Sequence, residues 1–161
     1  MDNATEVAAG HLATAAQKAR EGVQNGHGGP FGAVVVHNAK PIAIAANEVL
    51  LRHDPTAHAE ILAIRAACRH LQTPHLRHCT LYTTCYPCPM CMGAVLWARL
   101  PRVVYAATPQ EAALAGFDDQ AFYQHLEKKQ FEAVHLAYQS HAEVSALFAQ
   151  WQHMANDRHT Y

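Results

Sequence analysis

Residues 33–44, AVVVHNAKPIAI, contain two short apolar runs, at 33–36 and 42–44, separated by a segment with Asn and Pro. The valines and isoleucines favour strands, and the intervening residues favour a turn, so we predict a β-hairpin here. Further along the chain, the segments 79–84, 103–105 and 134–136 also predict strands. The hairpin therefore opens a sheet that later segments extend.

Helical patterns alternate with these strands. Apolar residues recur at helical spacing between loop signals such as the Gly- and Pro-rich segment 25–30. The predicted helices cover residues 5–23, 57–71, 90–99, 109–114, 121–128 and 140–154. A hairpin followed by alternating helices and strands indicates a mixed α/β layer fold.

Length and composition restrict the class of protein. A chain of 161 residues predicts one domain, here 1–161, and an apolar fraction of 50% excludes a disordered chain. Twelve basic and thirteen acidic residues give a net charge of −1, which argues against a nucleic-acid partner. No apolar run has the length of about 18 residues that a membrane helix needs, and the N-terminus lacks signal-peptide features. We expect a cytoplasmic protein, no membrane association and a small-molecule partner.

The cysteines indicate metal chemistry. There are five, an odd number that fits a disulfide framework poorly. The strongest pattern is His58-Ala59-Glu60 followed by Pro87-Cys88-Pro89-Met90-Cys91. Together His58, Cys88 and Cys91 form a Cys₂His set, and three protein ligands with one open position are typical of catalytic zinc.

Glu60 is the candidate catalytic residue beside this set. Both ligand groups lie at predicted helix starts, where the partial positive charge of the helix stabilises thiolates. Zinc lowers the pKa of its bound water from about 15.7 to about 7, and a nearby carboxylate can accept the released proton. His-x-Glu followed by Pro-Cys-x-x-Cys is the signature of zinc nucleobase deaminases.

Other assignments of the cysteines stay open at this point. Cys85 could be a fourth ligand of a structural zinc site, or it could pair with Cys88 in place of Cys91, since both spacings are Cys-x-x-Cys. Cys68 and Cys79 fall within a predicted helix and a predicted strand, and we interpret them as buried, inert thiols.

At these motifs the sequence resembles the cytidine-deaminase-like superfamily, and within it the bacterial guanine deaminases. The resembling stretches cover nearly the whole chain and end in an aromatic and polar C-terminus. They are residues 29–33, 54–60, 87–94, 97–99 and 115–119. The zinc motif identifies the superfamily, whereas Gly-Phe-Asp-Asp at 116–119 and the terminal Tyr161 point to the guanine deaminase branch.

The resemblance implies a three-layer α/β/α fold around a mixed five-stranded sheet, with Zn²⁺ bound and Glu60 moving protons. It implies substrate contacts by Phe31, Asn47 and Asp119. It also implies a homodimer that exchanges the segment of about 140–161, with Tyr161 laid over the active site of the other subunit.

The implied reaction is hydrolytic deamination of a free aminopurine, guanine to xanthine and ammonia. One position departs from the family pattern: Tyr86 stands where guanine deaminases often have Glu, beside the zinc ligands. Guanosine, ammeline (an aminotriazine) and cytosine therefore stay open as substrates. A tRNA adenosine deaminase and a zinc-stabilised scaffold without catalysis are the remaining alternatives.

Overall fold

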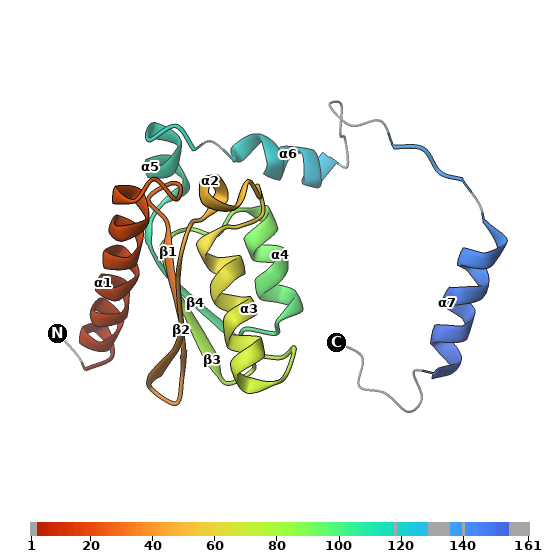
Figure 1. Ribbon diagram of the computed structural model, residues 1–161, viewed down its shortest axis with the longest axis horizontal. Helices are drawn as coiled ribbons and strands as arrows, with labels where there is room; N and C mark the ends of the chain where they lie inside the picture. The colour runs from red at the N-terminus through yellow and green to blue at the C-terminus, as the bar shows by residue number, and fades with distance from the viewer. Residues whose placement is uncertain (1–2, 118, 129–135, 140, 155–161) are drawn as a thin grey trace. The chain divides into compact units, whose positions relative to one another are not determined.

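The computed structural model of the protein describes residues 3–117, 119–128, 136–139 and 141–154. The chain divides into two compact units, Met1–Ala121 and Phe122–Tyr161, and each is described by itself. The larger unit is built from α1 (Asn3–Gln24), β1 (Gly32–His37), β2 (Lys40–Ala46), α2 (Val49–Arg52), α3 (Ala59–Leu71), β3 (Cys79–Cys85), α4 (Pro89–Trp97), β4 (Arg102–Ala107) and α5 (Pro109–Leu114) (Figure 1).

The sheet of the larger unit is mixed, as predicted. Its strand order is β2-β1-β3-β4; β1 is antiparallel to both of its neighbours, and β3 and β4 are parallel. The expectation of five strands is not met, because the described residues form four. Of the strand expected at 134–136, residues 134 and 135 lie outside the described residues, and Leu136 has no regular secondary structure.

The predicted hairpin is confirmed. Asn38 and Ala39 connect β1 and β2 with φ angles of 48° and 63°. Two successive positive φ angles are typical of the type I′ turn, whose twist matches that of paired strands. The ladder runs from the pair His37↔Lys40 to Gly32↔Ala46, so β2 is longer than its apolar run suggested.

Helices cover both faces of the sheet. Because successive strand residues point to opposite faces, Val34 and Val36 cluster with Ala15 of α1. Ala33 and Val35 instead belong to the cluster formed with α3 and α4. Figure 1 shows α1 on one side of the strands and α3 with α4 on the other. Each buried valine contributes about 1.5–3 kcal/mol relative to an exposed one, so the central strand β1 stabilises both layers.

Gly32 lets α1 lie directly on the sheet. A Cβ atom built on Gly32 would lie 2.0 Å from the backbone oxygen of Ala15, which is itself fully buried. No side chain fits in that space, so the contact between helix and strand is made backbone to backbone. This contact holds the start of β1, and therefore the end of the sheet on which the candidate site is built.

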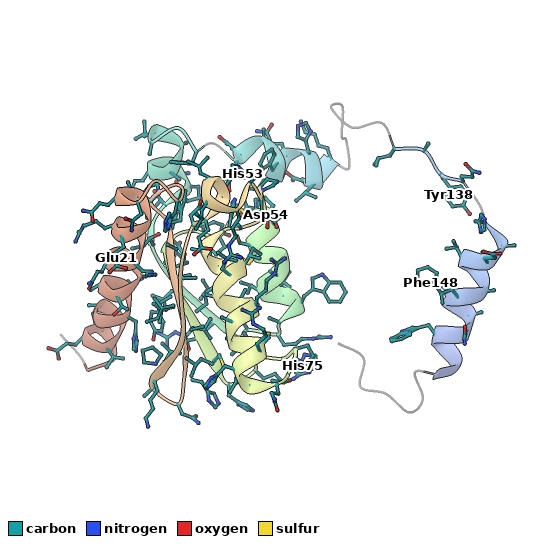
Figure 2. The ribbon with its side chains drawn as sticks, viewed as in Figure 1. Glu21, His53, Asp54, His75, Tyr138 and Phe148 are labelled. Carbon is teal, nitrogen blue, oxygen red and sulfur yellow. The ribbon has the colours of Figure 1, made fainter. Side chains whose placement is uncertain are left out.

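The smaller unit contains most of α6 (Gln120–Lys128) and all of α7 (Ala142–Met154), close to the helices predicted at 121–128 and 140–154. On α7 the side chains of Val144, Leu147, Phe148 and Trp151 are exposed. Figure 2 shows Phe148 projecting from this helix. None of the helices in the described part of the chain is both long and apolar enough to cross a membrane.

Candidate active site

The candidate metal ligands lie where two helices begin. His58 is the N-cap residue of α3, and Cys88 is the N-cap residue of α4. Pro89 follows Cys88 as a first-turn residue, a position that proline favours because no helical N–H is lost there. Cys91 is the third residue of α4. The prediction that both ligand groups lie at helix starts is therefore confirmed.

The loop before α3 is held by local hydrogen bonds. Oδ1 of Asp54 accepts from the backbone N–H of Thr56 at 2.8 Å and from its hydroxyl at 2.7 Å. These two hydrogen bonds lower the pKa of Asp54. The carbonyl of the fully buried Ala57 accepts from the N–H of Glu48 at 3.0 Å. Figure 2 labels Asp54 in this loop, between α2 and α3, where it fixes the backbone that carries His58.

The three predicted ligands converge. Nδ1 of His58 lies 3.6 Å from Sγ of Cys88 and 3.5 Å from Sγ of Cys91. Tetrahedral zinc with Zn–S near 2.3 Å and Zn–N near 2.0–2.1 Å separates such nitrogen and sulfur atoms by about 3.6 Å. The observed spacing therefore fits one zinc ion. In the described part of the chain this group has three members, which leaves one coordination position for water or substrate.

Cys85 takes no part in this group. It ends β3, and its Sγ lies 4.0 Å from the carbonyl oxygen of Thr108. Burial raises the pKa of this thiol to about 11. Among the described residues, His58 and Cys88 are grouped with Cys91 and not with Cys85. The geometry thus favours the Cys88–Cys91 pair over both alternatives that the spacing left open.

The two remaining cysteines lie apart from this group. Cys79 is buried, as expected, whereas Cys68 is half-buried, because it packs at the edge of the core cluster. Burial raises the pKa of both thiols.

The two ligand sulfurs differ in charge. A hydrogen bond from Cys91, together with one from His58, lowers the pKa of Cys88 to about 4, so Cys88 is a thiolate at neutral pH. The same contact with Cys88, with burial and the nearby Glu60, raises the pKa of Cys91. The hydrogen bond with Cys88 also raises the pKa of His58. Zinc binding needs both thiolates and a neutral imidazole nitrogen, so loading this site releases protons.

Glu60 is buried next to the cluster. Its side chain is 4% exposed, and its Oε2 lies 3.6 Å from Sγ of Cys91. Burial raises the pKa of Glu60, and hydrogen bonds from its own backbone N–H and from the hydroxyl of Thr83 partly oppose that rise. A buried carboxyl group with a raised pKa, at the second residue of α3 and beside a metal-ligand cluster, is chemically able to accept and return a proton.

Thr83 is a site residue that the sequence analysis missed. It is fully buried in β3, and its hydroxyl donates to Oε1 of Glu60 at 3.0 Å. The sequence marks 79–84 only as a buried strand. Thr83 is one of three threonines in this segment, and nothing local distinguishes it from Thr80 or Thr84, because its partner is 23 residues away in sequence.

Phe31 and Asn47 lie together at one end of the sheet. Gly32 and Ala46 are paired partners, and beyond them the N–H of Asn47 donates to the carbonyl of Phe31 at 2.9 Å. The ring of Phe31 contacts Phe117 edge-on, with centroids 4.8 Å apart. Thr83, the partner of Glu60, is paired with Ala33 next to this same end.

The buried side chain of Asn47 lies against a glycine. Oδ1 of Asn47 accepts from the N–H of Val49 at 3.2 Å, and the residue is 4% exposed. A Cβ on Gly28 would come within 2.0 Å of that Oδ1 atom. The glycine-rich loop therefore abuts the amide directly, which the sequence motif did not reveal.

The remaining predicted residues differ in how they are placed. Asp119 is half-buried, and its charge contributes to the raised pKa of His58, so the structure brings it near the cluster. Tyr161 lies outside the described residues. Tyr86 contacts Tyr105 edge-on at a centroid distance of 5.1 Å, and its N–H joins the end of β3 to Ala107 of β4.

Residues 6–107 match the family model described as the cytidine and deoxycytidylate deaminase zinc-binding region. The chain belongs to this family of zinc-dependent deaminases. The Cys₂His cluster is accordingly a zinc site, with Zn²⁺ as the cofactor of an aminohydrolase.

Two similarities extend over almost the entire chain. The chain is 47% identical to a guanine deaminase of Bacillus subtilis over 148 residues, which covers 91% of this chain and 95% of the relative. The X-ray structure of guanine deaminase from Bacillus subtilis covers 100% of both chains, with 42% identity and a TM-score of 0.87.

A third similarity is shorter. A tRNA-specific adenosine deaminase of Buchnera aphidicola subsp. Baizongia pistaciae is 47% identical over 78 residues, but this match covers only 48% of each chain. The similarity to the tRNA-specific adenosine deaminase therefore covers about half of this chain, whereas the similarity to guanine deaminase extends over both units of this chain.

Proposed function

We propose that this deaminase hydrolyses guanine to xanthine and ammonia. One observation carries the proposal: the cluster of His58, Cys88 and Cys91 has Glu60 beside it, in a chain that is similar to a guanine deaminase over 91% of its length. In this reaction water adds to the ring carbon that bears the exocyclic amine, a C–O bond replaces the C–N bond, and the amine leaves as ammonia.

Each residue of the cluster has a separate task. His58 and the two cysteines hold the zinc, which when bound supplies a Lewis acid that makes water a nucleophile near pH 7. Glu60 accepts a proton from the water and delivers it to a ring nitrogen; it then takes the second proton from the added hydroxyl and passes it to the amine, which leaves as ammonia. General acid–base catalysis of this kind contributes a factor of about 10² to 10⁴ in rate.

Substrate recognition falls to Phe31, Asn47 and Asp119. The aromatic ring of Phe31 offers a face for stacking on a flat purine. Oδ1 of Asn47 accepts one hydrogen bond, from the N–H of Val49, which fixes the amide so that its NH₂ group can donate to an acceptor edge of a base. Asp119, which already acts on His58 electrostatically, supplies a negative charge on the same side.

The whole chain works as a single deaminase domain in a cytoplasmic homodimer that exchanges the segment of about 140–161. The exposed apolar side chains of α7 support this part of the proposal, because such a helix face is ordinarily covered by a partner surface. Tyr161 then serves as the lid residue over the other subunit's site.

Ammonia release tests the proposal. The zinc-loaded protein is incubated with guanine, guanosine, cytosine, adenine, ammeline and tRNA, and the same panel is given to Glu60→Gln and to the control Glu21→Gln. Glu21 lies on α1 and interacts with Lys18, so its substitution leaves the chemistry alone. We expect wild type and Glu21→Gln to turn over guanine, and Glu60→Gln to bind zinc but lose at least about 10²-fold in rate.

The other outcomes discriminate between the alternatives. Turnover of a different base would keep the mechanism and assign the changed specificity to the surroundings of Tyr86. Turnover of tRNA alone would favour the adenosine deaminase. Unchanged activity in Glu60→Gln would remove Glu60 from the reaction.

A further inference from the structure

Among the residues that the structure describes, Thr83 is the one whose hydroxyl group donates a hydrogen bond to the Glu60 carboxylate. The donor Oγ1 and the acceptor Oε1 are 3.0 Å apart, with Thr83 fully buried and Glu60 4% exposed. The bond joins the inner strand β3, near the end of the sheet where Thr83 is paired with Ala33 of β1, to the first turn of α3. It is therefore a fixed contact between two well-packed elements.

The apolar surroundings explain why a hydroxyl here needs this partner. Thr83 lies on the same face of β3 as Leu81, which is fully buried in the core cluster with α3. A hydroxyl buried without a hydrogen bond costs free energy, whereas valine would have the same shape at no such cost. Packing alone therefore does not account for threonine at this position, and the carboxylate of Glu60 does.

The two oxygens of Glu60 are not equivalent in this arrangement. Oε1 accepts from Thr83, while Oε2 lies 3.6 Å from Sγ of Cys91, on the side of the metal cluster. The last torsion of a glutamate is broad and intrinsically has little preference, so an unsupported carboxylate would sample many orientations. The backbone N–H of Glu60 also donates to this carboxylate, and the hydroxyl of Thr83 adds a donor from β3 that restricts Oε1 to one of these orientations.

We propose that Thr83 is a positioning residue for catalysis: it holds Oε1 of Glu60 so that Oε2 is the oxygen that exchanges the proton. This inference rests on the proposed deaminase reaction and on the role of Glu60 in it. Thr83 acts through Glu60 and does not touch zinc or substrate. Proximity and orientation of a catalytic group contribute to rate and not to substrate affinity, so its loss changes kcat and leaves binding intact.

The test compares Thr83→Val, Thr83→Ser and a control, Thr80→Val. Thr80 is half-buried at the start of the same strand, and its hydroxyl group has no hydrogen-bond partner among the described residues, so its substitution reports the general cost of valine in β3. Thr83→Val is expected to lower kcat on guanine about 10- to 100-fold, the range for a lost hydrogen bond to a charged group. KM, zinc content and the Kd of xanthine are expected to stay at wild-type values. Thr83→Ser keeps the hydroxyl and is expected to restore most of kcat.

A measurement without turnover accompanies the kinetics. Crystal structures of the zinc-loaded wild type and Thr83→Val are expected to show the Glu60 carboxylate in one orientation in the first and rotated or split in the second. Thr83→Ala, which removes the hydroxyl with a different shape, replaces Thr83→Val in both measurements if valine prevents folding.

The possible results distinguish a failure of the proposed substrate from a failure of the proposed role of Thr83. Failure of wild type on guanine overturns the proposed substrate, and the kinetic comparison then uses the base that is turned over, while the crystal structures test the positioning of Glu60 directly. An unchanged kcat in Thr83→Val, a loss that serine does not restore, or an unmoved carboxylate would each overturn the inference.

Discussion

His58 and Cys88 occupy equivalent structural positions: each is the N-cap residue of its helix, and Nδ1 of the first lies 3.6 Å from Sγ of the second. Neither uses its side chain to cap the helix. Both side chains therefore remain available to a metal ion, at positions where a helix N-terminus carries partial positive charge. A positive charge at this point favours the thiolate form of Cys88, whose pKa is about 4, so the helix start that presents this ligand also prepares it for zinc.

Substitution of single cysteines should distinguish a zinc ligand from a cysteine that only lies nearby. We expect Cys91→Ala to lose zinc, because it removes one of three converging donors, and Cys85→Ala to keep it, because Cys85 lies outside the group. Loss of a residue that merely supports a ligand typically costs about 10- to 100-fold in metal affinity, so the effect in Cys91→Ala should exceed this range. Zinc content is measured by mass spectrometry after dialysis against a competing chelator. The reverse pattern would establish Cys85 and Cys88 as the ligand pair.

Thiol alkylation should follow the pKa values of the cysteines. In chelator-treated protein, Cys88, with a pKa of about 4, is expected to react with iodoacetamide even near pH 5, because it remains a thiolate above its pKa. Cys85, with a pKa of about 11, is expected to stay unmodified there and at pH 7, since it is protonated below its pKa. Peptide mass spectrometry assigns the modified residue. Zinc-loaded protein serves as the control, in which Cys88 is protected; labelling of Cys85 before Cys88 would contradict the assignment.

The ligand set could be predicted from sequence because its parts are local. His58 precedes a helical pattern, and Cys88 and Cys91 are three residues apart within one helical turn. These local patterns are enough to identify the three residues as candidate metal ligands. The choice between Cys85 and Cys91 needed the structure. It depends on where β3 ends and α4 begins, a boundary that spacing does not specify.

Contacts between side chains that are far apart in the sequence could not be predicted from the sequence. The partnership of Thr83 with Glu60 depends on the register of β3 and on how α3 lies over it. The short helix α2 was also not predicted, since its four residues are too few to show a helical period. Similarly, the contact between Gly28 and Asn47 depends on how the glycine-rich loop folds back onto the end of β2. The number of glycines in the loop does not predict it.

The hairpin turn offers a stabilising substitution. Ala39 has a φ of 63°, a left-handed conformation that costs a residue with a Cβ about 1–2 kcal/mol. Ala39→Gly removes this cost and adds a smaller entropic one, so we expect a net gain of roughly 0.5–1 kcal/mol in the free energy of unfolding. Denaturant unfolding measures it. Glycine at the exposed Ala13, inside α1, should instead lower the free energy of unfolding by about 1 kcal/mol. A loss of stability in Ala39→Gly would show that the turn is not left-handed in solution.

Gly28→Ala should impair substrate binding while sparing the metal site. The added Cβ would come within 2.0 Å of Oδ1 of Asn47, so the amide must move and give up its hydrogen bond from Val49. A misplaced Asn47 loses its proposed contact with the base, and a hydrogen bond of about 1.4 kcal/mol corresponds to a roughly tenfold rise in KM. Zinc content should be unchanged, because none of the three ligands touches Gly28 in the described contacts.

Two further variants make the Gly28 result specific. Gly10→Ala adds the same methyl group to α1, where nothing lies within 4 Å, so it should leave KM unchanged and stabilise the helix by up to about 1 kcal/mol. The double variant Gly28→Ala/Asn47→Ala lacks the amide with which the new Cβ collides. If Gly28 acts through Asn47, the two effects on KM are strongly non-additive, and the double variant resembles Asn47→Ala alone. Additive effects would instead mean that the loop contacts the substrate independently of Asn47.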